Sequence, residues 1–403
     1  MKTRLEADLA TVFLRWIWWR AVLHNGWWLV TSIYLVVDAG LSPFQLVLIG
    51  VAQGAIALVC EIPAGVIADT ISRKWSLVFS HVLMGTAMIA TGLVTDFGLL
   101  VATQMLWGLS WTFASGADVA WITDELDEPD RISGVLMRSG GAQLTGAAVG
   151  IVGLGALAAL TQRSTAMVLA GATMLLLGLY VVFRFREQRF TRAPTPRRSA
   201  SWSILVRGVT LVRGSRAILV MFAATFLVNG ASSSGRLFPR RLVDIGLPSD
   251  PVVWYTALGV LTLLVGAATL RVVGSHVEGV RPALLGYVIA CAAGGAGLIV
   301  LAVAPEKVSG SAAILLVSGI AMPLTRTIGT IWVNQQTSGD VRATVHSFLA
   351  QAEYLGEIVC GLAIAVIAQL AGISLSLVVS AALFAFTIVL IQRVGAPRTV
   401  ETP

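Results

Sequence analysis

Long apolar stretches separated by short polar turns are the feature that most constrains the fold of this chain. About twelve stretches are long enough to cross a membrane, since roughly 20 apolar helical residues span a hydrocarbon core of about 30 Å. Of the 403 residues, 56% are hydrophobic and 12% are charged, which exceeds what one soluble core can bury. Because lipid offers the backbone no hydrogen bonds, the spans are expected to be α-helices.

The expected helices form two sets of six on either side of a linker. Pro, Ser and Arg are frequent in this linker, residues 186–216. The sequence therefore predicts an all-α membrane protein with an N-terminal six-helix bundle at 1–185 and a C-terminal six-helix bundle at 217–403. Residues 202–216 fit either a helix on an anionic membrane surface or an ordinary basic loop. The predicted spans are 12–36, 43–69, 74–95, 98–124, 132–160, 164–185, 217–240, 251–272, 282–303, 311–336, 341–369 and 372–393.

Basic residues concentrate in alternate loops. Nine arginines but one acid, Glu187, lie between Arg184 and Arg216. Lysine and arginine stay preferentially on the cytoplasmic side, so both termini and the middle loop are expected there. The first span has no small-residue cleavage pattern before it and is expected to act as its own insertion signal. The predicted location is the cell inner (cytoplasmic) membrane, with many passes.

A short charged turn separates the second and third spans. Beginning at Gly65, it reads Gly-Val-Ile-Ala-Asp-Thr-Ile-Ser-Arg-Lys-Trp-Ser-Leu. The spacing of Gly65, Asp69 and Arg73 resembles the loop signature of the major facilitator superfamily, Gly-x-Leu-Ala-Asp-Arg-x-Gly-Arg-Arg. Thr70 and Ser72 stand where that pattern has Arg and Gly. The resemblance extends over nearly the whole chain, because the superfamily also has two six-helix bundles.

The resemblance implies a secondary transporter with a substrate site near the midplane between two similar bundles. It also implies that Asp69 and Arg73, with Gly65, form a conformational latch that holds the outward-facing state. Arg73 would pair with an acid at the cytoplasmic end of the fourth helix, for which Asp124 is the candidate. The alternative is that these charges serve only membrane topology.

Two further segments resemble bacterial drug-exporter-like members of the superfamily. They end the fourth span, at 115–125, and join the tenth to the eleventh, at 332–347. Drug/proton antiporters have Arg-x-x-Gln-Gly in the fourth helix, whereas this chain reads Gln104-Met-Leu-Trp-Gly108. The proton-linked arginine of that group is therefore absent. Branch resemblance implies efflux but leaves the coupling site open.

Ionisable side chains inside the spans are candidates for function, because each costs roughly 2.5 to 3.5 kcal/mol at a helix centre. Arg20 and His24 share one face of the first helix with several tryptophans. The superfamily lines its central cavity with helices one, four, seven and ten. For the tryptophans, anchoring at the membrane interface is an alternative role. The predicted substrate-cavity residues are Arg20, His24, Trp27, Trp111, Asp118, Asn229, Arg236 and Arg326.

Two acids in the eleventh helix, Glu353 and Glu357, are the predicted proton-coupling residues. Arg326 lies at a similar depth to Glu353, so the two could pair. Glu357 has no basic partner at its depth in this count, and desolvation would favour its protonated form. The alternative is that both acids are fixed structural partners of Arg326, His346 or a bound water.

The sequence favours transport over other activities. The chain has no His-Glu-x-x-His motif, no Gly-x-Ser-x-Gly elbow and no phosphate-binding Gly-x-x-x-x-Gly-Lys-Ser/Thr loop. Cys60, Cys291 and Cys360 lie far apart in apolar stretches, so no disulfide or metal site is expected. We expect no enzyme activity, no cofactor and no metal.

The leading hypothesis is proton-coupled efflux of amphipathic drugs or natural products by alternating access. The alternatives are transport of a specific small, possibly anionic, metabolite and, more distantly, a non-transporting membrane receptor. The expected partners are a small-molecule substrate, protons as coupling ion and the lipid bilayer. No nucleic acid is expected, and the chain is expected to be a monomer.

Overall fold

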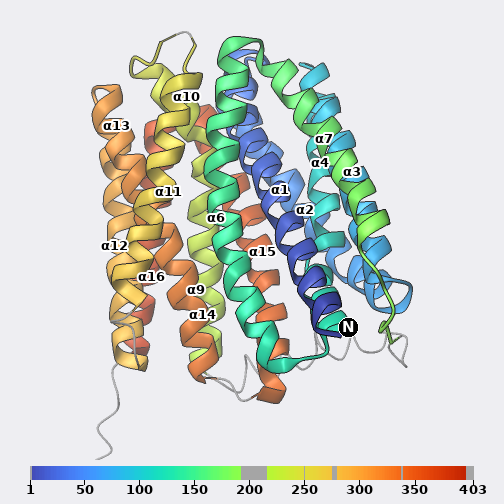
Figure 1. The fold of residues 1–403 in the computed structure, drawn as a ribbon. Helices are drawn as coiled ribbons and strands as arrows, with labels where there is room; N and C mark the ends of the chain where they lie inside the picture. The colour runs from blue at the N-terminus through green and yellow to red at the C-terminus, as the bar shows by residue number, and fades with distance from the viewer. Residues whose placement is uncertain (1, 192–215, 249, 275–278, 337–338, 396–403) are drawn as a thin grey trace, which may run out of the picture. The chain divides into compact units, whose positions relative to one another are not determined.

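The computed structural model describes residues 2–191, 216–248, 250–274, 279–336 and 339–395 (Figure 1). Every regular element in these ranges is a helix, which satisfies the backbone hydrogen bonds within each segment. The predicted all-α membrane fold is confirmed. The proposed surface helix at 202–216 lies outside the described residues except for its last position, Arg216, where the next helix begins.

The first half of the chain follows the predicted spans, with one difference. Its helices are α1 (Lys2–Val37), α2 (Pro43–Thr70), α3 (Arg73–Leu93), α4 (Phe97–Ala114), α5 (Ala117–Leu126), α6 (Pro129–Leu160) and α7 (Arg163–Arg184). The stretch predicted as one helix at 98–124 is broken between α4 and α5. Gly116 has φ of 73° there, a left-handed backbone that glycine adopts without steric cost.

The second half contains two further interruptions. Its elements are α9 (Arg216–Ser232), the 3₁₀ helix η1 (Ser233–Leu237), α10 (Phe238–Asp244), α11 (Val252–Gly274), α12 (Val280–Val303), α13 (Lys307–Ile314), the π-helix η2 (Leu315–Ala321), α14 (Met322–Gln336), α15 (Gly339–Ala371) and α16 (Ile373–Gly395). The predicted seventh and tenth spans are therefore changed in pitch by η1 and η2. Stretches of 3₁₀ and π-helix inside longer helices are frequent at functional sites.

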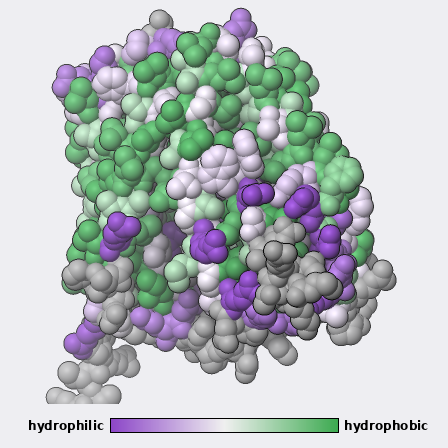
Figure 2. Space-filling model, viewed as in Figure 1, coloured by the Kyte–Doolittle hydropathy of each residue, from purple (hydrophilic) through white to green (hydrophobic). Residues whose placement is uncertain are grey.

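Eleven helical segments in the described residues are long and apolar enough to cross a membrane. The long first helix, α1, is not among them, because polar side chains such as Arg15, Arg20 and Asn25 lower its hydropathy. Large apolar side chains remain exposed on the outside of the helices, including Leu160 at 85% and Leu370 at 81%. Figure 2 shows apolar residues covering much of the visible face. A surface this apolar needs lipid around it, so the chain is a multi-pass membrane protein.

The helices pack into two compact units. Unit 1 contains residues 1–41, 52–198 and 249–260, and unit 2 contains 42–51, 199–248 and 261–403. Each unit thus includes a short segment from the other half of the sequence. In unit 1, Arg163 at the start of α7 holds Asp250, before α11, at 2.8 Å and Asp38, after α1, at 2.5 Å.

A close approach between helix backbones is found in both units. A Cβ atom at Gly150 of α6 would overlap the carbonyl oxygen of Val22 in α1, and one at Gly356 of α15 would overlap that of Phe226 in α9. Small residues let membrane helices approach this closely. The sequence separation between the two contacting residues is closely similar in the two helix pairs, as expected for two structural repeats.

Candidate functional site

In unit 1, the guanidinium group of an arginine packs against tryptophan rings. Arg20 of α1 approaches Asp118 of α5 at 3.4 Å, and both side chains are mostly buried. The guanidinium carbon lies 4.9 Å from the ring centre of Trp111 and 5.2 Å from that of Trp16. The break at Gly116 places Asp118 in the first turn of α5, where the helix dipole favours a negative charge. The structure therefore brings three of the predicted substrate-cavity residues, Arg20, Trp111 and Asp118, into contact.

His24 extends the same cluster by one turn of α1. Its ring stacks on Trp107 at 5.4 Å with an interplanar angle of 19°, and it also contacts Trp111 at 5.3 Å. His24 Nδ1 and Trp107 Nε1 are buried atoms without a hydrogen-bond partner in the structure. We call Arg20, His24, Trp107, Trp111 and Asp118 the indole cluster.

Trp27 differs from the other predicted cavity residues of unit 1. It is fully buried, stacks behind Trp107 at 6.2 Å, and donates from Nε1 to the Met88 carbonyl oxygen at 3.4 Å. A side chain in this position supports the indole cluster and presents no surface to a ligand. The prediction that Trp27 lines a cavity is not supported by its burial, because the Trp107 indole of α4 stacks on it.

Gln104, which stands where the antiporter pattern has arginine, is part of a neutral network. Its amide oxygen accepts a hydrogen bond from Gln53 at 2.8 Å, and its amide nitrogen donates to Thr91 at 3.0 Å. The Gln104 side chain is completely buried. This position joins α2, α3 and α4 and offers no charge to a proton or substrate.

Unit 2 contains a cavity of about 500 Å³, which lies in the size range of small-molecule sites. Helices α9, α12, α14 and α15 and the π-helix η2 form its walls. Three of the predicted site residues line it together, namely Asn229, Arg326 and Glu353. Further polar residues of the wall are Thr225, Tyr287, Ser318, Thr325 and Thr330, together with His346, which was considered above as a partner of the two acids.

Arg326 and Glu353 face this cavity from opposite helices without joining directly. Their charges interact, but they are not within ion-pair distance of each other. In the part of the chain that the structure describes, neither side chain makes a hydrogen bond or ion pair. The expected Arg326–Glu353 pair is therefore wrong as a direct contact, because the cavity lies between the helices that carry them.

Arg236 and Glu357 are displaced from the cavity. Neither belongs to the cavity wall, and the Arg236 side chain packs against Gly50, where a Cβ would overlap its Nε. The charges of Arg236 and Glu357 interact. The prediction that Glu357 has no basic partner at its depth is therefore wrong. Counting depth along separate helices cannot show that η1, which carries Arg236, packs beside α15.

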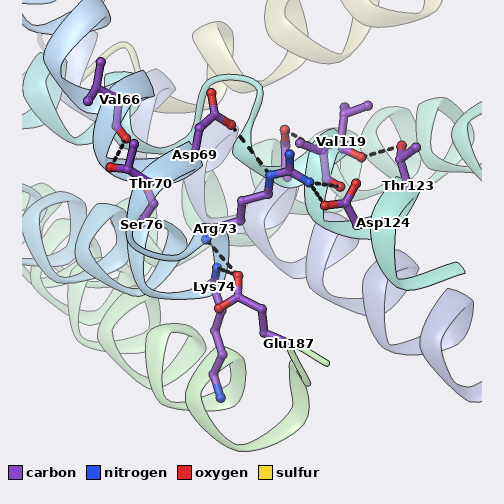
Figure 3. A network of polar contacts seen from close by, with 12 residues as sticks. Val66, Asp69, Thr70, Arg73, Lys74, Ser76, Val119, Thr123, Asp124 and Glu187 are labelled. Carbon is purple, nitrogen blue, oxygen red and sulfur yellow. Dashed lines mark hydrogen bonds and ion pairs between the residues drawn. The ribbon is translucent and has the colours of Figure 1, made fainter. Parts of the chain in front are cut away.

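The charged turn between α2 and α3 forms a network in unit 1, drawn in Figure 3. The Arg73 side chain forms an ion pair with Asp124, lies 3.7 Å from Asp69, and donates to the Ala120 carbonyl oxygen at 2.9 Å. The expected Arg73–Asp124 contact is thus present. A Cβ at Gly65 would meet no atom within 4 Å, so close packing does not require glycine there.

Glu187 is an additional member of this network. Its carboxylate accepts hydrogen bonds from the backbone N–H groups of Arg73 at 2.8 Å and Lys74 at 3.1 Å (Figure 3). It also accepts one from the Ser72 hydroxyl. These N–H groups belong to the first turn of α3 and have no partner within the helix. One signal could have identified it, since Glu187 is the single acid in an arginine-rich stretch.

Comparison with known proteins agrees with a membrane-transport architecture. The Major Facilitator Superfamily profile matches residues 20–359. No curated protein sequence matches the chain. Among solved structures, the nucleoside transporter NupG matches with a TM-score of 0.78 and 12% identity, over 96% of this chain and 99% of that chain. Fold and comparisons together define a membrane transporter and not an enzyme.

Two other solved structures share the fold. A POT family transporter in complex with 5-aminolevulinic acid has a TM-score of 0.74 and 13% identity, over 96% of this chain and 95% of that chain. The human organic anion transporter MFSD10 has a TM-score of 0.60 and 16% identity, over 96% and 99%. The chain belongs to the major facilitator superfamily.

Proposed function

We propose that the protein is a proton-coupled exporter of amphipathic organic compounds, working by alternating access in the cytoplasmic membrane. The observation that carries this proposal is the polar cavity of unit 2, which Glu353 and Arg326 face without pairing. A carboxylate that is not held in an ion pair can exchange a proton with water or yield it to a substrate. The indole cluster of unit 1 adds flat aromatic surface suited to a partly apolar compound.

Glu353 is the proposed proton carrier, and Glu357 is its structural neighbour. The titratable or charged groups around Glu353 are Arg326 and His346 in the same cavity, Tyr287 of α12, and Glu357 one turn further along α15. Only Glu353 of the two acids lines the cavity. Glu357 interacts instead with Arg236, which fixes a positive charge beside it.

The Arg73 network is proposed as the conformational latch. Arg73 is held by Asp69 and Asp124, and its backbone N–H is capped by Glu187, so the guanidinium has a defined position. All four residues belong to unit 1. The proposed latch therefore lies at this preorganised end of α3.

The test is flux of lipophilic cationic dyes in proteoliposomes with an imposed pH gradient. Glu353→Gln is expected to lose the gradient-dependent part of the flux, whereas Glu357→Gln, the same substitution one turn away, retains it. Asp69→Asn is expected to slow flux without removing the gradient dependence. Gradient dependence that survives in both glutamine variants would overturn the assignment of coupling to these acids.

The second candidate is transport of one small anionic metabolite. It is favoured by Arg326, whose guanidinium faces the cavity with no carboxylate of the described residues in direct contact. In the same assay this candidate predicts no dye flux and inhibition by a single hydrophilic anion. Specific binding without flux of any compound would instead favour a receptor.

A further inference from the structure

We infer that the cavity of unit 2 binds zwitterionic compounds, with the anionic group at Arg326 and the cationic group at Glu353. This inference rests on the proposed function and names its substrate class. The two side chains carry opposite charges, line one cavity of about 500 Å³, and leave a gap between them. A ligand that presents both charges can satisfy both side chains at once.

Ligands with a single charge fit these walls less well. A cation at Glu353 would face Arg326 without compensation, and an anion at Arg326 would face Glu353. In a site of reduced dielectric, each like-charge approach is unfavourable, so both residues act against ligands of one sign. A zwitterion satisfies both and adds no net charge to the cavity.

The remaining walls indicate the body of the ligand. Met221, Val228, Met322 and Trp332 supply apolar surface, while Asn229 and Thr225 stand one turn apart on α9 with polar groups. His346 Nε2 of α15 lies 3.0 Å from Asn334 Oδ1 of α14, at the edge of the cavity between these two helices. This mixture fits a compound with a compact apolar body and a small polar head that carries both charges.

The test compares three probes with one body and different charges. Phenylalanine is a zwitterion, phenylalaninamide a cation, and N-acetylphenylalanine an anion. Leucine with its amide and N-acetyl derivative forms a second series. Half-saturating concentrations are measured by ligand-induced thermal stabilisation of the purified protein. A charge-assisted contact contributes enough for about a tenfold change in affinity. Each zwitterion is therefore expected to bind at least about ten times more tightly than its amide and its N-acetyl derivative.

Two variants then assign the charges. Arg326→Gln is expected to erase the preference for the zwitterion over the amide, and Glu353→Gln the preference over the N-acetyl compound. Glu357→Gln, outside the cavity wall, is the matched control and should keep both preferences. The melting temperature without ligand shows that each variant is folded, and Arg326→Lys tests whether charge alone suffices.

Equal affinity, or no detectable affinity, across both series in the wild-type protein overturns the inference. The same holds if both glutamine variants at 326 and 353 retain full discrimination. Gradient-driven dye flux without zwitterion preference would leave the proposed function standing and remove only this inference. Zwitterion preference without gradient-driven flux would remove proton coupling and leave the inference intact.

Discussion

Each unit contains an arginine and a carboxylate that face each other, and the two groups are in contact in unit 1 but apart in unit 2. In unit 1, Arg20 and Asp118 are 3.4 Å apart, with 12% and 19% of their side chains exposed, under two indole rings. In unit 2, Arg326 and Glu353 face a cavity and do not touch. The backbone contributes to this difference, because the break at Gly116 puts Asp118 at the start of α5, whereas Arg326 and Glu353 lie on α14 and α15 on either side of the cavity.

This contrast separates charges that hold a structure from charges that are available to a ligand. In a mostly buried ion pair, each charge compensates the other, so removing one partner leaves an uncompensated buried charge. An arginine and a glutamate that face solvent-accessible space without pairing lose little on substitution. Structural charge and functional charge can therefore be told apart by measuring stability and flux on the same variants.

The largest effect on stability is expected for Arg20→Ala. It leaves Asp118 mostly buried without its cation, and we expect the free energy of unfolding to fall by about 3 kcal/mol. The measurement is unfolding by denaturing detergent in mixed micelles. The double variant Arg20→Met with Asp118→Leu removes both charges and should recover most of the loss. An Arg20→Ala protein as stable as wild type would show that the two units do not differ in this respect.

The close helix approach that is found in both units can be tested by replacing the glycines that allow it. Gly150→Ala and Gly356→Ala each place a methyl group against a carbonyl oxygen of the neighbouring helix, which should cost about 1 to 3 kcal/mol of unfolding free energy. Gly153→Ala, one turn from Gly150, is the control, because its Cβ would meet no atom within 4 Å. A large loss at Gly150 with none at Gly356 would contradict a common frame for the two helix pairs.

Sequence patterns predicted the parts of this architecture that depend on local order. Span length and hydropathy placed the helices, and helical periodicity brought Arg20 and His24 onto one face. The break at Gly116 was missed because an isolated glycine inside a helical run is compatible with an unbroken helix. Its consequence is that Asp118 starts a new helix, which no periodicity argument anticipates.

Contacts between distant segments were predicted less well. Glu187 caps α3 from beyond α7, and a capping acceptor so far along the chain has no sequence pattern that assigns it. Counting residues along each helix placed Arg326 and Glu353 at a similar depth, and the two do line one cavity. The count could not predict whether their side chains are in contact. It also left Glu357 without Arg236, because the neighbours of a helix depend on tertiary packing.

The smallest effect on stability is expected for Arg326→Gln. Because Arg326 is exposed to the cavity and makes no ion pair in the described residues, the free energy of unfolding should change by less than about 0.5 kcal/mol. Flux of a transported compound should nevertheless fall about tenfold or more, since a charge-assisted contact with the substrate is lost. Both quantities are measured on one purified preparation, beside Arg20→Ala. If Arg326→Gln loses as much stability as Arg20→Ala, Arg326 is a structural charge, and the distinction between the two units fails.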